Sequence, residues 1–143
     1  MRRLVCATAL AFALGVGGCF GSGGGGKKAA PTPAEAANAF IKCFQKPGYQ
    51  AVEPKQGQES LFAAQVKSHG YDVAPANVTK PNAVAASAYL VFFKDDAAAK
   101  KAKDEVEVTN SSDASPLERG QVIVGYLDED SKTDLEPAII GCL

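Results

Sequence analysis

This chain is poor in the residues from which many catalytic and metal sites are built. It has one histidine, His69, and four cysteines that are widely spaced along its 143 residues. A structural zinc site needs a local set of Cys and His ligands, so none is expected. The zinc-protease motif H-E-x-x-H and the nucleophile elbow G-x-S-x-G are also absent. We therefore predict no catalytic residues, no metal and no cofactor.

The chain also lacks an excess of positive charge. Fifteen Lys and Arg residues stand against 16 Asp and Glu, and four of the basic residues precede Ala34. From Ala34 onward the balance is 11 basic against 16 acidic residues. A protein that binds nucleic acid through backbone phosphates needs a basic surface, so no nucleic-acid partner is expected. An apolar content of 46% indicates a globular protein.

No apolar run has the length of a membrane-spanning helix. The longest candidate covers residues 4–16 and is rich in Ala and Gly, whereas about 20 apolar residues are needed to cross a bilayer. Arg2 and Arg3 precede this run. Two basic residues followed by a short apolar segment are typical of a secretory signal peptide.

The end of this segment carries a recognisable motif. Val16-Gly17-Gly18-Cys19 resembles the lipobox of bacterial lipoproteins, in which an aliphatic and two small residues precede a cysteine. The resemblance implies that Cys19 becomes the mature N-terminus and is joined through its sulfur to diacylglycerol. Acyl chains such as palmitate would then anchor the protein to the extracytoplasmic side of the cell membrane. The alternative is ordinary secretion after cleavage behind Ala11-Phe12-Ala13.

The remaining cysteines form a pair under the lipoprotein interpretation. Cys6 leaves with the signal peptide and Cys19 carries the lipid, so Cys43 and Cys142 remain. Export into an oxidising compartment favours a disulfide between them. We predict a structural Cys43–Cys142 bridge that ties the two ends of the folded domain together.

The chain divides into a signal peptide (1–18), a lipidated Gly-rich tether (19–33) and one α+β domain (34–143). Thr32, Pro33 and Glu35 predict a capped helix start. Further elements are expected as a short strand at 49–53, a helix at 58–69 with Leu61, Phe62 and Val66 inward, a strand at 84–93, a helix from Asp95 to Val106, a strand at 121–127 and a short helix capped at Thr133. This alternation favours a small two-layer sandwich, ferredoxin-like, with helices on one face of a three- or four-stranded sheet.

Two candidate sites have plainer explanations. A nucleophilic Cys43–His69 pair would need a free thiol and an orienting group, whereas His69 is well placed to bond the last carbonyls of a helix. Asp128, Glu129 and Asp130 form the densest acidic segment, but Lys132 falls where a calcium ligand would be needed. We interpret the first as a helix end and the second as a solvated loop.

The sequence favours a non-enzymatic lipoprotein that binds an envelope component or has a structural role. Its expected partners are membrane lipid, through Cys19, and an envelope protein or a small ligand. One alternative is a small-ligand binding module that uses an open face of the sheet. A less favoured alternative is an envelope hydrolase whose carboxylates are brought together by folding.

Overall fold

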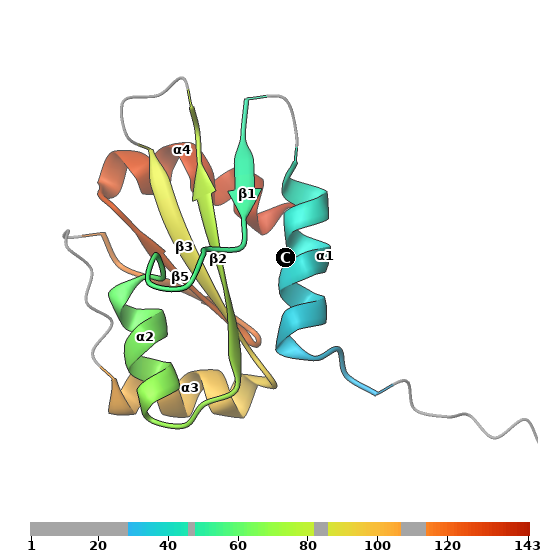
Figure 1. Ribbon diagram of the computed structural model, residues 1–143. Helices are drawn as coiled ribbons and strands as arrows, with labels where there is room; N and C mark the ends of the chain where they lie inside the picture. The colour runs from blue at the N-terminus through green and yellow to red at the C-terminus, as the bar shows by residue number, and fades with distance from the viewer. Residues whose placement is uncertain (1–28, 46–47, 82–85, 107–113) are drawn as a thin grey trace, which may run out of the picture.

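The computed structural model describes residues 29–45, 48–81, 86–106 and 114–143. Helices and strands alternate through these residues (Figure 1). In chain order they are α1 (Pro33–Phe44), β1 (Gln50–Val52), α2 (Leu61–Ser68), β2 (Val73–Thr79), β3 (Ser87–Phe93), α3 (Asp96–Glu105), β4 (Leu117–Arg119), β5 (Val122–Tyr126) and α4 (Glu129–Ile140).

The described strands form one open antiparallel sheet in the order β1-β2-β3-β5-β4. β3, the strand predicted at 84–93, lies at its centre and is apolar on both sides. Leu90 and Phe92 join a core with α1 and α4, whereas Val91 and Phe93 join a second core with α2 and α3. Successive side chains of a strand point to opposite faces. The molecule therefore has three layers, with helices on both faces of the sheet.

This arrangement corrects the finer part of the fold prediction. The α+β class is confirmed, but the two-layer sandwich with helices on one face is wrong, and the described sheet has five strands. The ferredoxin-like arrangement is also wrong. In that fold another strand lies between the two parallel strands of each β-α-β unit, whereas here β1 and β2, which flank α2, pair directly with each other and are antiparallel.

β2 and β4 were not expected from the sequence. β2 contains Pro75, which cannot donate a ladder hydrogen bond and normally argues against a strand. In the structure β1 pairs only with Asn77–Thr79. Pro75 therefore lies on a part of β2 that forms the sheet edge, where a missing N–H is tolerated. β4 has three residues and no buried side chain, so it leaves little periodic signal.

The first helix begins as predicted. The Thr32 hydroxyl accepts a hydrogen bond from the Glu35 backbone N–H at 3.3 Å, and the Glu35 carboxylate accepts one from the Thr32 backbone N–H at 2.8 Å. These reciprocal bonds satisfy two donors that helix geometry leaves free. They also hold the Glu35 pKa below its usual value, because both groups of Thr32 stabilise the carboxylate. α1 then buries Phe40 and Phe44 against the sheet.

Two other helices show where predictions from the spacing of residues agree with the structure and where they do not. α3 has Asp95 as its N-cap and Val106 as its C-cap, as predicted, and it buries Ala99 and Ala102. In α2, Phe62 and Val66 are buried, but Leu61 is 61% exposed because it is the first helical residue. The inward placement of Leu61 was wrong.

The last helix starts earlier than expected. Asp128 is its N-cap and accepts a hydrogen bond from the Ser131 backbone N–H at 2.6 Å. The predicted cap, Thr133, lies inside α4, together with Pro137 in its second half. The added first turn brings Ser131 against the sheet, where its hydroxyl accepts a hydrogen bond from the Ser87 backbone N–H.

Candidate functional site

The structure joins Cys43, near the end of α1, to Cys142, just after α4. Their Cα atoms are 5.7 Å apart, and the bridge closes a separation of 99 residues. It connects the two helices that cover the same face of the sheet. Cys19, the predicted lipid attachment residue, lies outside the described residues.

His69 has the role expected of a histidine at a helix end. Its Nδ1 lies 3.0 Å from the carbonyl oxygen of Gln65, and its backbone N–H donates to the same oxygen. Cys43 has no free thiol, because its sulfur is bonded to Cys142. The two residues therefore do not form a nucleophilic pair.

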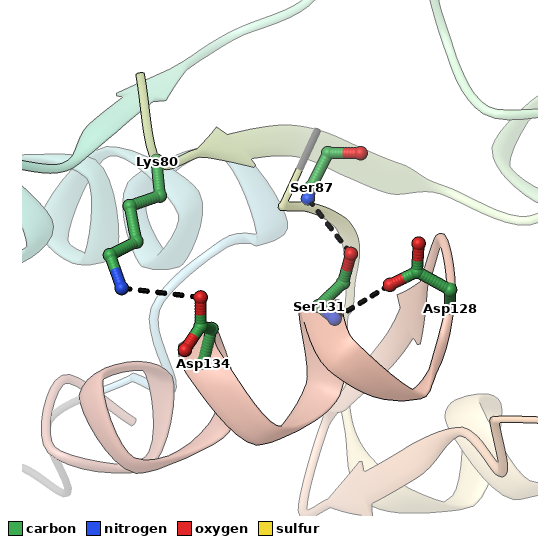
Figure 2. Close-up of polar contacts among 5 residues, drawn as sticks. All are labelled: Lys80, Ser87, Asp128, Ser131 and Asp134. Carbon is green, nitrogen blue, oxygen red and sulfur yellow. Dashed lines mark hydrogen bonds and ion pairs between the residues drawn. The ribbon is translucent and has the colours of Figure 1, made fainter. Parts of the chain in front are cut away.

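The acidic segment is not the solvated loop that the sequence predicted, because Asp128 is the N-cap of α4 and Glu129 and Asp130 belong to its first turn. Figure 2 shows Asp128 at the helix start and Asp134 further along α4, one turn after Ser131, where its Oδ2 lies 3.2 Å from Lys80 Nζ. Bonds from Ser131 hold the pKa of Asp128 below its usual value. Within the described residues, no three side chains of the kinds that ligate metals converge on one point.

Ser131 is the buried polar link between α4 and the sheet. It is fully buried, and its hydroxyl oxygen accepts a hydrogen bond from the Ser87 backbone N–H at 3.2 Å. The hydroxyl of Ser87 is directed away from Ser131 (Figure 2). This bond fixes one side of β3 to α4. The Ser87 side chain points toward the opposite face of the sheet.

That opposite face is covered only in part by α2 and α3. Beyond these helices, the strand register sets out two rows of side chains across the sheet. The first row contains Val52, Asn77, Tyr89 and Gly125, and the second contains Gln50, Thr79, Ser87 and Leu127. We call these eight residues the open face. Val52 and Leu127 are 55% and 42% exposed, so part of its apolar surface meets solvent.

The centre of the open face is the ring of Tyr89. A Cβ placed on Gly125 would lie 2.0 Å from Tyr89 Cζ. The ring can therefore lie against the β5 backbone only because residue 125 has no side chain. Phe62 of α2 packs beside it, with ring centroids 6.4 Å apart. Burial raises the pKa of the Tyr89 phenol to about 12.

A hollow of about 250 Å³ lies over this part of the sheet. Its walls come from the upper ends of β2, β3 and β5 in Figure 1 and from the segment that leads into α2. Side chains that contribute include Tyr89, Asn77 and Leu127, together with Glu59 and Ser60 before α2. The Asn77 amide donates to the Gln58 carbonyl oxygen at 3.4 Å, which ties the segment to the strand.

A second hollow, of about 410 Å³, lies at the other end of the same face. Its lining includes Tyr71, Lys94, Asp95 and Lys101. Asp95 is engaged as the α3 cap, since it accepts a bond from the Ala98 N–H at 2.7 Å. Tyr71 donates to the carboxylate of Glu105 at 2.5 Å, and this bond raises the pKa of Tyr71 to about 12. Lys101 also pairs with Glu105, at 3.5 Å, so three of the polar side chains that line this hollow already have partners.

Sequence reasoning considered ligand binding on an open face of the sheet, but it did not identify the residues of that face because it missed β2. Without that strand, Asn77 had no expected position beside Tyr89. One signal was present: Gly125 interrupts an otherwise apolar strand, and an isolated glycine there indicates close approach by another group.

No protein-family model, curated protein or solved structure matches this chain. In the part of the chain that the structure describes, no helix has the length and apolar character needed to cross a membrane.

Proposed function

We propose that this chain is a lipid-anchored lipoprotein whose exported domain has a non-enzymatic, binding or structural role. The observation that carries the proposal is the Cys43–Cys142 bridge, taken together with the lipobox-like segment that ends at Cys19. Disulfides persist in oxidising compartments outside the cytoplasm. Two independent features, one before the domain and one within it, thus favour the same location.

The position of α1 supports a tethered arrangement. α1 starts at Pro33, soon after the Gly-rich segment. In Figure 1 its first turn lies at the end of the sheet where β3 finishes and α3 begins. The chain therefore enters the domain at the end opposite the hollow over Tyr89. A lipid on Cys19 would thus tether the domain from the end opposite that hollow.

The intact mass of the protein from the membrane fraction tests the proposal. We expect a chain that begins at Cys19, is heavier by two or three acyl groups, and gains two protons on reduction of the bridge. The matched control is Cys19→Ala, which should lose the added lipid while the bridge persists. A chain that starts near residue 14 and carries no lipid would refute the anchor and favour free secretion.

A hydrolase is the less favoured alternative. It would need two carboxylates facing each other across a cleft. In the described lining of the hollow over Tyr89 the one carboxylate is Glu59, whose Oε1 lies 2.8 Å from Lys67 Nζ. A small-ligand binding module is better supported, because this hollow combines an aromatic ring with amide and hydroxyl groups.

A further inference from the structure

We propose that the open face binds a neutral sugar ring of a glycan, with Tyr89 as the stacking platform and Asn77 as the main polar contact. This inference names a ligand class for the proposed binding role, and its placement outside the cell rests on that proposed function. It is carried by the position of an aromatic ring, an amide and two hydroxyls on one sheet surface.

The platform comes from the pairing of Tyr89 with Gly125. Because Gly125 has no Cβ, the ring lies against the β5 backbone and is supported from below. Phe62 also limits its movement from the side. An aromatic face carries partial negative charge, which attracts the weakly positive C–H groups on one side of a sugar ring. A ring already held in place loses little conformational entropy when a ligand stacks on it.

The polar contacts surround this platform. The bond from Asn77 to the Gln58 carbonyl uses one amide hydrogen, so a ligand can use the other hydrogen and the amide oxygen. Thr79 and Ser87 face each other in the strand register, one step further along β2 and β3. The Ser87 backbone N–H is occupied by Ser131, and its hydroxyl points the other way (Figure 2). Amide and hydroxyl groups are suited to the hydroxyls of a sugar.

Charge and size narrow the ligand class. Glu59 is the one charged residue among the described residues lining the hollow, and Lys67 pairs with it. No lining charge there is left to select an ionic ligand. The volume of about 250 Å³ is below the roughly 300–1,000 Å³ typical of sites for drug-sized molecules. It suits one ring, and neighbouring rings of a glycan would extend over the exposed Val52 and Leu127.

The test uses the full-length chain purified from membranes in a detergent with a phosphocholine headgroup, because sugar-headed detergents would compete. Calorimetry and ¹H–¹⁵N spectra would be recorded with two neutral probes, an N-acetylglucosamine trisaccharide and maltotriose. The variants are Tyr89→Ala and Asn77→Ala. Tyr71→Ala is the matched control, because it removes an aromatic ring at the other end of the same face. Thermal unfolding of each variant checks that it remains folded.

We expect at least one probe to bind and to shift the Gly125 amide and the Asn77 side-chain signals. Tyr89→Ala and Asn77→Ala should each weaken binding by about tenfold or more, equivalent to roughly 1.4 kcal/mol, while Tyr71→Ala leaves it unchanged. Asn77→Ala keeps the test decisive if Tyr89→Ala fails to fold.

Three results would overturn the inference. The first is the absence of binding by both probes at about 10 mM, which corresponds to less than roughly 3 kcal/mol of binding free energy. The second is a set of NMR signal shifts confined to other surfaces. The third is binding that Asn77→Ala leaves unchanged. Sedimentation that shows a dimer disrupted by Leu127→Asp would identify a second copy of the chain as the occupant instead. None of these measurements reads the lipid on Cys19, so failure here is distinct from failure of the proposed anchor.

Discussion

Removal of the Cys43–Cys142 bridge should destabilise the domain through the unfolded chain and not through lost packing. The side chain of Cys43 is exposed and that of Cys142 is only partly buried. A Cys43→Ala/Cys142→Ala variant therefore leaves little cavity in the core. What it removes is a cross-link between positions 99 residues apart.

The size of the effect follows from loop closure. For a loop of about 100 residues, the chain-entropy relation gives about 4.7 kcal/mol at 25 °C, and measured values for native bridges are commonly about 2–4 kcal/mol. A domain of about 110 residues has an unfolding entropy near 230 cal/mol/K, so each kcal/mol lowers Tm by about 4 °C. We expect the variant to melt about 8–20 °C below the wild type.

Urea unfolding followed by circular dichroism measures both quantities that matter. The free energy of unfolding should fall, and the m-value should rise, because an uncrosslinked unfolded chain exposes more surface. Wild-type protein treated with reductant should match the alanine variant. A control that replaces the exposed Lys100 with Ala should change the free energy of unfolding by no more than about 0.5 kcal/mol and leave the m-value unchanged.

The reasoning would be refuted by a Tm change of less than about 4 °C, equivalent to roughly 1 kcal/mol. An equally informative contradiction would be a large loss of stability with an unchanged m-value. That result would place the effect in the folded state, where the structure shows little packing to lose.

Three further changes test the local geometry. Gly125→Val should lower the free energy of unfolding by about 1–3 kcal/mol through overpacking. Adding Tyr89→Ala should restore part of this loss, because the valine side chain then has space. Additive losses in urea unfolding would contradict the contact between residues 89 and 125. Thr32→Ala should lower the free energy of unfolding by about 1 kcal/mol through loss of a helix cap. Thr133→Ala, inside α4, should lower it much less. Equal losses for the two variants would disprove the assigned helix starts. Asp128 has a lowered pKa when folded, so its contribution is present above its ordinary pKa of 3.8 and is lost as pH falls through the folded value. Asp128→Asn should therefore flatten the acid side of the stability–pH profile, and an unchanged profile would rule out the bond to α4.

The sequence was sufficient wherever a short local pattern determines the conformation. Thr32, Pro33 and Glu35 predict the start of α1, and Asp95 predicts the start of α3, because a helix cap involves only residues within one turn. The central strand β3 was recognisable because it is apolar on both sides. That same pattern indicated burial on both faces, and a second layer of helices is the form this burial takes.

Only the tertiary structure decided features that depend on residues far apart in the chain. Pro75 belongs to a strand because β1 is too short to reach it, and this depends on sheet pairing. Asp128 caps α4 in preference to Thr133 because Ser131 must bond the backbone of β3. Gly125 and Tyr89 meet because β5 pairs with β3, although α3 and β4 lie between them in the chain. Local patterns thus determined where elements begin, whereas long-range pairing decided which face each one covers and where the candidate binding surface lies.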